Sequence, residues 1–277
     1  MMVCQVLAQQ AFVVVELSYE LSDAELAAFA RDGVIPLRGV LDQDTLSRVQ
    51  QAANRARNGP GGFWYSIYLW RQDVDFRACA LNQGLAAIAA KLLGASKLNL
   101  LYDQLFIKPP KGEPTPWHHD LPYWPIDGDG VVSLWIALSD VDAANGGLEF
   151  IRGSHRWGRR FRNFTVDRAS ERYLPLSAYD DVESMPDFDQ NRDRYDVLNW
   201  DLAPGDALAF HALTLHHAPA NSSARYPREG YALRYMSEAV RYRESDGMNK
   251  HVFNHALRNG DGMESEQYPT VYEAGMQ

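Results

Sequence analysis

The order of apolar and polar positions predicts helices in the first third of the chain and short strands in the rest. Ser22–Glu25 reads as a capping box, in which the serine accepts from a backbone N–H three residues on and the glutamate reaches back. Glycines then stop the periodic stretches, as is typical after a helix. The helices predicted in this way run through Phe29 to Gly33, from near Asp42 or Asp44 to Arg57, and over about Leu81–Leu93 with Gly94 at the end.

From Lys97 onward the pattern changes to short apolar runs between segments rich in Gly, Pro, Asn and Asp. The runs read LNLLYDQLFIK, VVSLWIALSDV, GLEFI, DALAFHALTLHH and GYALRYMSEAV. Runs of this length with such separators are typical of a β-sandwich or barrel. A long polar and aromatic segment over about 153–202 has no clear periodicity and predicts a lid-like insertion.

The 277 residues contain no internal repeat, low-complexity tract or obvious linker, so a single domain over 1–277 is the simplest account. It would consist of N-terminal helices over about 20–95, a mainly β core over about 97–240, and the insertion over about 153–202. The apolar start lacks a basic region and is interrupted by polar residues, which predicts an early strand or tail rather than a signal peptide.

Composition narrows the classes of partner. Lys and Arg total 27 against 36 Asp and Glu, a net charge of −9, which disfavours nucleic acid and anionic membrane surfaces. Two cysteines without CxxC spacing argue against a disulfide framework, and no apolar run approaches the length of a membrane span. We therefore expect a cytoplasmic protein that acts on a small-molecule substrate, with no nucleic acid and no membrane as partner.

The stretch WHHD at residues 117–120 is a candidate metal site. On an extended segment residues i and i+2 share a face, so His118 and Asp120 can converge on one ion whereas sequence neighbours cannot. An imidazole and a carboxylate are two of the three ligands of a 2-His-1-carboxylate facial triad, which leaves open positions on Fe(II). The second histidine has to come from His155, His211, His216, His217, His251 or His255. His251 and His255 have the spacing of a zinc pair on a helix, although a surface helix is the simpler interpretation.

An arginine downstream of FHALTLHH matters for a co-substrate. 2-Oxoglutarate chelates iron through its keto and C1-carboxylate oxygens and leaves its C5 carboxylate to be held, which a guanidinium does with two parallel hydrogen bonds. Arg228 is the candidate, and an exposed arginine on a loop is the alternative interpretation.

Several segments taken together resemble the phytanoyl-CoA dioxygenase (PhyH-like) family of Fe(II)/2-oxoglutarate-dependent oxygenases. They read DQLFIKPPKGEPTPWHHDLPYW, SLWIAL, NGGLEFIRGSHRWG and PGDALAFHALTLHHAPANSS with a later PR, within about Leu17–Tyr242. The resemblance implies a double-stranded β-helix, the jelly-roll or cupin-like core, flanked by helices. It places the iron ligands at His118, Asp120 and His216, the last counted back from the asparagine of HHAPAN. His217 then stands where the family often has glycine, and strand alternation would turn it away from the iron.

The same resemblance assigns the co-substrate site. It places 2-oxoglutarate against Arg228, although the spacing from His216 is one residue longer than expected and leaves Arg234 as the fallback. The other positions that it puts beside the co-substrate, each of which could instead be barrel packing, are Thr115, Trp135, Gln104 and Lys108. Related halogenases have a small residue at the carboxylate position, so the retained Asp120 implies oxygen insertion or desaturation and not halogenation.

The implied activity is hydroxylation of an unactivated C–H bond in a small molecule, with release of succinate and CO2. The cofactors would be Fe(II), 2-oxoglutarate as co-substrate, and O2, and no catalytic residue beyond the iron ligands is expected.

Aromatic residues expected along the substrate pocket, or else packing the helices on the barrel, are Tyr123, Trp124, Trp64 and Tyr68. The arginines of HRWGRRFRNF could attract an anionic substrate or form a solvated loop. The alternatives are desaturation or another oxidation in a biosynthetic pathway, a zinc-dependent hydrolase, and a non-catalytic cupin-like binder.

Overall fold

The computed structural model describes residues 19–57, 64–167, 172–176, 182–244, 248 and 250–275. The predicted N-terminal helices are present with the predicted caps. The Ser22 hydroxyl accepts from the Glu25 N–H at 3.3 Å, and the Glu25 carboxylate accepts from the Ser22 N–H at 2.8 Å. Gly33 has a left-handed φ of 78°, which is typical of the residue after a last helical turn. The helices are α1 Asp23–Asp32, α2 Gln43–Ala56, α3 Val74–Ala80 and α4 Gln83–Leu93.

Helix α3 is an addition to the predicted set. Its 7 residues are too few for an apolar period to be visible in the sequence. It begins at Asp73, whose carboxylate accepts from the N–H groups of Asp75 and Phe76. The stop at Asn58–Gly62 that the sequence predicts after α2 lies outside the described residues.

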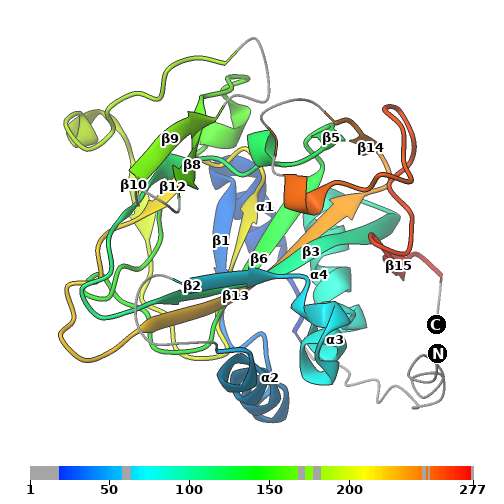
Figure 1. The fold of residues 1–277 in the computed structure, drawn as a ribbon, viewed down its shortest axis with the longest axis horizontal. Coiled ribbons are helices and arrows are strands. Elements are labelled where there is room, and N and C mark those ends of the chain that lie inside the picture. Colours follow the sequence, from blue (N-terminus) through cyan, green and yellow to red (C-terminus); the bar gives the residue numbers. More distant parts are fainter. Residues whose placement is uncertain are drawn as a thin grey trace.

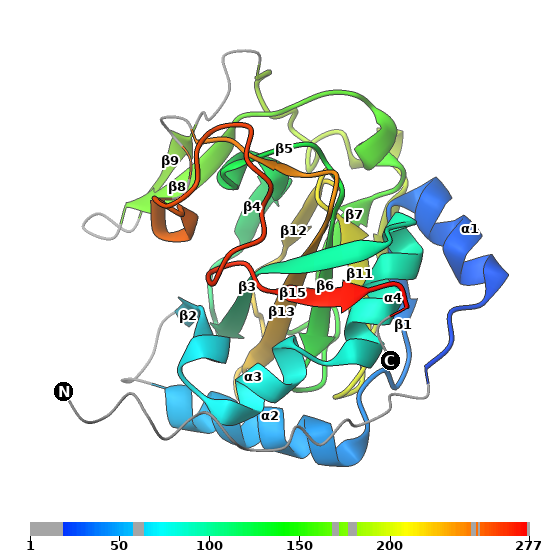
Figure 2. The ribbon, with the colours of Figure 1, turned by 90° about the vertical axis from the view of Figure 1, so that its right-hand side faces the viewer.

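Seven strands form the larger of the two antiparallel sheets that make the core (Figure 1). They follow the order β1-β11-β6-β13-β3-β15, and β2 also pairs with β3. Their bounds are β1 Val34–Leu37, β2 Trp64–Ile67, β3 Lys97–Lys108, β6 Val131–Ala137, β11 Ala207–His211, β13 Arg228–Ser237 and β15 Thr270–Glu273. Helices α2, α3 and α4 cover one face of this sheet (Figure 2). The apolar side chains from both layers form a large buried cluster. The β core therefore extends past its predicted end near residue 240, since β15 joins this sheet.

The smaller sheet lies on the opposite, inner side and contains four strands in the order β10-β7-β12-β4. Their bounds are β4 Thr115–His118, β7 Glu149–Ile151, β10 Val197–Asn199 and β12 His216–Ala218. Side chains of both sheets, among them Trp135, Phe150 and Phe210, pack between them. Two facing antiparallel sheets of this kind form a double-stranded β-helix, so the predicted fold class is confirmed.

Strand β13 shows how the larger sheet separates its two faces. Its odd-numbered residues Tyr231, Leu233 and Tyr235 are 0% exposed and belong to the cluster beneath the helices. Strand alternation therefore directs the even-numbered residues, from Arg228 to Arg234 and beyond, to the inner face. This inner face, opposite the smaller sheet, is where polar side chains can meet out of contact with bulk water.

The segment predicted as a lid is structured in its described part. Strands β8 Asn163–Asp167 and β9 Arg172–Leu176 form a hairpin, whereas β10 already belongs to the smaller sheet, so the insertion is shorter than predicted. Several polar contacts hold it against the core, and three of them involve side chains of Asn163, Asp189 and Arg192. They join Trp117 Nε1 to Asp189 Oδ1 at 3.0 Å, Arg192 Nη2 to Glu149 Oε1 at 2.7 Å, and Asn163 Nδ2 to the His119 carbonyl at 2.7 Å.

The remaining elements are short. Strand β14 Arg241–Tyr242 pairs with β5 Ile126–Asp127. The 3-10 turns are η1 Leu69–Arg71, η2 Leu121–Tyr123, η3 Ser154–Arg156, η4 Arg192–Arg194 and η5 Lys250–Val252. The helix considered for His251 and His255 is only the turn η5, which ends before His255, so a zinc pair at helical spacing is not formed. Among the described residues, no helix is both long and apolar enough to cross a membrane.

Candidate metal centre

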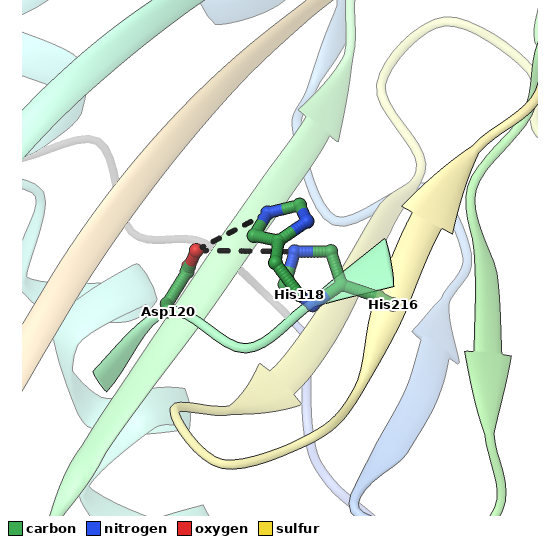
Figure 3. A group of neighbouring side chains, drawn as sticks. All are labelled: His118, Asp120 and His216. Carbon is green, nitrogen blue, oxygen red and sulfur yellow. Dashed lines mark ion pairs between the residues drawn. The ribbon is translucent and has the colours of Figure 1, made fainter. Parts of the chain in front are cut away.

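Three side chains from two segments that lie far apart in the sequence converge at the inner face. His118 ends β4, His216 begins β12, and Asp120 follows β4 by two residues (Figure 3). Asp120 Oδ1 lies 3.8 Å from His118 Nε2 and 3.9 Å from His216 Nε2. The three ligand atoms lie within 4.8 Å of one another, and no other group of three such residues does so in the described part of the chain.

Strand pairing places the two histidines, and a turn places the aspartate. His118 and His216 are direct partners in the antiparallel β4–β12 pair, which puts their rings on one face with centroids 4.2 Å apart. Asp120 has left the strand: its φ of −73° and ψ of −34° begin the 3-10 turn η2. His118 and Asp120 do converge, as expected from the sequence. The expected cause, alternation along one strand, is wrong, because the turn η2 positions Asp120.

Each histidine is held in the tautomer that a metal requires. His118 Nδ1 lies 2.8 Å from the Pro116 carbonyl, and His216 Nδ1 lies 2.9 Å from the Thr214 carbonyl. A ring that donates its Nδ1–H to a carbonyl keeps the lone pair of Nε2 free, and the Nε2 atoms face Asp120. Burial lowers the pKa of His118 and lowers the pKa of His216 to about 3. Both rings are therefore neutral at pH 7.

Asp120 is held as an anion. Burial alone would raise the pKa of its carboxyl, but the Arg234 cation and the hydrogen bond from Ser133 lower it. Its Oδ2 lies 3.4 Å from Ser133 Oγ and 3.6 Å from Arg234 Nε, so Oδ1 is the oxygen directed at the histidines. Two neutral imidazoles and a carboxylate are a donor set for a divalent ion such as Fe(II). Around an ion about 2.1 Å from each atom the donors would lie about 3 Å apart, so each of the two distances between Asp120 and the histidines has to shorten by about 1 Å.

The other histidines of the core face elsewhere. His217 points to the opposite face, where its Nε2 lies 2.6 Å from Glu149 Oε2 and its ring stacks on Trp117 with centroids 3.9 Å apart. His155 and His211 lie beside each other, with ring centroids 5.4 Å apart, and neither belongs to the converging group. Of the histidines considered from the sequence, the structure brings only His216 to the His-x-Asp stretch.

His119 contacts the insertion and is expected to make stability depend on pH. Its Nε2 accepts from the Phe161 N–H at 3.1 Å, and burial lowers its pKa to about 4. A histidine in the unfolded chain keeps a pKa near 6.5. Between that pH and about 4 the unfolded chain therefore binds a proton at this residue that the folded chain does not bind. We expect this residue to lower the free energy of unfolding by up to roughly 3 kcal/mol as the pH falls from about 7 to about 4.

Urea denaturation of the metal-free protein near pH 7 and near pH 4.5 measures this effect. The His119→Gln variant keeps a side-chain acceptor for Phe161 but does not titrate in this range. Its free energy of unfolding should therefore fall less steeply on acidification than that of the unchanged protein. Equal falls in the two proteins would contradict the assignment.

Two buried cations, Arg228 and Lys108, lie further along the inner face. They are direct partners across β13 and β3, and they are 3% and 0% exposed. Burial lowers the pKa of Arg228 to about 10, and burial together with repulsion from Arg228 lowers the pKa of Lys108 to about 7. Lys108 Nζ donates to the carbonyls of Ala218 and Pro219, and neither cation forms an ion pair with a carboxylate among the described residues. A bound dicarboxylate would supply the missing counter-anion.

Two more of the predicted co-substrate residues line the same face. Gln104 on β3 and Trp135 on β6 are both register partners of Ala232, so they stand on either side of β13. The Trp135 ring lies over Gly230, where a Cβ atom would be 1.9 Å from it, and only glycine leaves room for the indole. The Arg228 guanidinium carbon lies 5.2 Å from the Trp135 ring centroid.

Thr115 and Arg234 occupy different places. Thr115 lies on the smaller sheet, opposite Ala218 in the β4–β12 pair. Arg234 follows Arg228 by six residues, about 20 Å of extended strand, and its Nε lies 3.6 Å from Asp120. The fallback arginine is thus at the metal end of the inner face, which favours Arg228 as the partner of a distant carboxylate.

Of the aromatic residues predicted for the substrate pocket, the structure places one, Tyr123, against an iron-ligand candidate. Tyr123 lies beside the centre, with its ring centroid 6.1 Å from that of His118. Trp124 is 0% exposed and donates from Nε1 to the Tyr102 hydroxyl at 2.9 Å, so it has no polar group left for a substrate and can only pack against one. Tyr68 is half-buried, and its ring lies 6.0 Å from that of Tyr102. The side chain of Trp64 lies outside the described residues.

Comparison with known proteins decides the family. The model of the family Phytanoyl-CoA dioxygenase (PhyH) matches residues 29–230. The chain belongs to the phytanoyl-CoA dioxygenase family. Ectoine dioxygenase of Sphingopyxis alaskensis is 26% identical over 251 residues, which cover 83% of this chain and 80% of that protein. A probable phytanoyl-CoA dioxygenase of Caenorhabditis elegans is 27% identical over 172 residues, 59% of this chain, and the match spans about half of that relative's length, 52%.

A solved structure agrees with this phytanoyl-CoA dioxygenase assignment in fold. The epimerase SnoN, in complex with Fe3+, α-ketoglutarate and nogalamycin RO, superposes with a TM-score of 0.70 at 24% identity. The match covers 89% of this chain and 96% of that one. The predicted family is confirmed, and it is a family of Fe(II)/2-oxoglutarate-dependent oxygenases. Iron and 2-oxoglutarate are the cofactors of that class, and the three converging donors and the paired cations fit them.

Residues beside the centre that sequence reasoning missed are Ser133, Tyr102 and Phe164. Ser133 and Tyr102 are the two register partners of Arg234, on β6 and β3. Strand alternation could have identified both from the sequence. Ser133 stands two residues before Trp135, and Tyr102 two before Gln104, so each shares a face with a predicted co-substrate residue. Phe164, whose ring centroid lies 5.5 Å from that of His118, comes from the insertion and has no such signal in the sequence.

Proposed function

We propose that the protein is an Fe(II)- and 2-oxoglutarate-dependent oxygenase that hydroxylates an unactivated C–H bond of a small-molecule substrate, with release of succinate and CO2. The observation that carries this proposal is the arrangement of the inner face. Two neutral imidazoles and one carboxylate converge at one end, and two buried cations without a carboxylate partner lie at the other. Membership of the family and the related ectoine dioxygenase support the same class of reaction.

In this proposal His118, Asp120 and His216 hold the iron. They occupy one side of the ion, which leaves positions for the co-substrate and O2. Iron and 2-oxoglutarate together supply the chemistry that activates O2 and cleaves a C–H bond. The side chains of His216 and Asp120 are only 7% and 8% exposed, so the protein also keeps bulk water from the reacting atoms.

The co-substrate would be held at the other end by Arg228, through its C5 carboxylate. Trp135 packs against the Arg228 guanidinium and fixes its orientation, and Gln104 lies across β13 from Trp135. Lys108 adds positive charge beside Arg228 and, through the Ala218 and Pro219 carbonyls, ties β3 to the segment after β12. Thr115 stands across from this segment at the edge of the same site. These roles follow from the charge and position of each side chain, and substitution of each residue would test its role.

Two kinds of alternative function are compatible with the same fold. A zinc hydrolase or a non-catalytic binder would use the same donors but would give Arg228 and Lys108 no anion to hold. Another reaction of iron and 2-oxoglutarate, such as desaturation or epimerisation, is the second candidate, because SnoN, which shares the fold and has iron and α-ketoglutarate in its complex, is an epimerase. The retained Asp120 ligand argues against halogenation in either case.

Anaerobic addition of Fe(II) and 2-oxoglutarate to the metal-free protein tests the proposal. We expect a weak metal-to-ligand charge-transfer band in the visible range, which neither component gives alone. Admission of air should then produce succinate. Folded protein that shows no band would contradict the proposal, and a hydrolase would form no succinate. Once a substrate is found, a product mass higher by one oxygen separates hydroxylation from desaturation or epimerisation.

A further inference from the structure

Arg234 is a buried cation in contact with the metal centre. It is 4% exposed, and its Nε lies 3.6 Å from Asp120 Oδ2. Aromatic rings surround its guanidinium carbon, with centroids 4.6 Å away for Tyr102, 5.8 Å for Trp124 and 5.9 Å for Phe106. Such ring contacts stabilise the charge but do not satisfy the N–H donors at the edge of the guanidinium.

Two of the three guanidinium nitrogens of Arg234 find no hydrogen-bond partner in the described part of the chain. Neither Nε nor Nη1 has a hydrogen-bond partner there, although both atoms are buried. The Asp120 oxygen at 3.6 Å is an ion-pair neighbour but lies beyond hydrogen-bond distance. Buried polar groups are almost always paired, and a buried charge with unpaired donors is costly. These two donors of Arg234 therefore lack a hydrogen-bond acceptor, although Asp120 is close enough to pair with the charge.

The charge balance of the inner face indicates the sign of that partner. The proposed iron brings two positive charges, and Arg228 and Arg234 bring one each, whereas Asp120 and 2-oxoglutarate together bring three negative charges. One positive charge is left over, and Lys108, whose pKa is about 7, adds a further fraction. Glu149 cannot compensate, because it is already engaged in its own ion pairs. A bound anion would neutralise the excess.

We infer that Arg234 binds an anionic group of the primary substrate, so that the substrate is a small molecule with a carboxylate or a similar anion close to the oxidised carbon. The inference rests on the proposed function, since iron and 2-oxoglutarate enter the charge balance. A guanidinium next to Asp120 holds such an anion beside the metal and so fixes which carbon faces it. The arginines of the insertion are less suited to this role: Arg159, for example, is exposed and pairs with Glu183.

Trifluoroacetate and its neutral counterpart trifluoroacetamide test this by 19F NMR, because both are small enough to enter a pocket of any size. The protein is loaded with Fe(II) and saturating 2-oxoglutarate under argon, and the paramagnetic ion broadens the signal of a probe bound near it. We expect trifluoroacetate to be broadened selectively, and Arg234→Gln to weaken its binding by about tenfold or more. Arg234→Lys should keep part of the affinity, because the charge remains. Arg225→Gln removes an exposed arginine and should change nothing.

The charge-transfer band, recorded on the same samples, separates the outcomes. A wild-type protein without the band would contradict the proposed function and remove the basis of the inference. A band with equal broadening of acid and amide, or broadening that survives Arg234→Gln, would overturn the inference and leave the proposed function intact. Loss of the band in both Arg234 variants would show that this arginine only positions Asp120, which would also overturn it.

Discussion

Replacing Asp120 with alanine is expected to abolish iron binding and, with it, the consumption of 2-oxoglutarate. The change removes the only anionic donor of the converging three and leaves Arg234 facing two neutral imidazoles. Changes behind the ligands of metal sites already cost about 10- to 100-fold in affinity, so we expect more than about 100-fold for the loss of a ligand. Iron content after desalting, together with the charge-transfer band, measures the effect.

His217→Ala is the matched control for this experiment. His217 adjoins His216 in the sequence, but its ring contacts Glu149 on the other side of the smaller sheet. The variant should keep iron at the wild-type stoichiometry, with lower stability because the buried Glu149 loses a partner. If His217→Ala lost iron and His216→Ala kept it, the roles of the two neighbours would be reversed.

Replacing Arg228 with methionine is expected to weaken 2-oxoglutarate binding by roughly 100-fold while iron stays bound. Methionine can keep the apolar contact with Trp135, but the C5 carboxylate would be buried without its guanidinium partner. Without 2-oxoglutarate the variant should be at least as stable as the unchanged protein, because a buried cation without an ion-pair partner is itself costly. Titration of 2-oxoglutarate into the Fe(II)-loaded protein, followed by the charge-transfer band, gives the apparent Kd.

The Arg234→Met variant serves as the comparison in the same titration. Arg234 lies on the same strand and is as deeply buried, but it stands beside Asp120 rather than beside Lys108. We expect its Kd for 2-oxoglutarate to stay within a few-fold of the unchanged protein. The reverse order, a large loss for Arg234→Met and a small one for Arg228→Met, would move the C5 carboxylate to Arg234.

Local signals explain what could be predicted from the sequence. The capping box at Ser22 and the stop at Gly33 act within one helical turn, so the bounds of α1 were readable without any tertiary information. The apolar runs of the core gave the strands for the same reason. The choice of His216 over His217 came from counting within a family motif, and the β4–β12 register then places His216 directly opposite His118.

Features that depend on contacts between distant segments could not be read in the same way. The position of Asp120 is set by the turn η2, which follows a strand too short to continue the alternation. The place of Arg234 depends on the register of β13 with β6 and β3, which a single sequence does not reveal. Strand β15 likewise joins the sheet only through its pairing with β3, more than 150 residues away.

The fastening of the insertion has a consequence for engineering. Asp189 attaches it to Trp117 on β4, Asn163 to the His119 carbonyl just after β4, and Arg192 to Glu149 on β7, which pairs with β12. A chimaera that exchanges only the stretch between Asn163 and Asp189 should therefore acquire a different substrate range and still retain its metal. A chimaera that also replaces Asp189 and Arg192 should hold the strands of the smaller sheet less rigidly, and with them the two metal-binding histidines. Selectivity and metal retention can thus be altered independently in this scaffold.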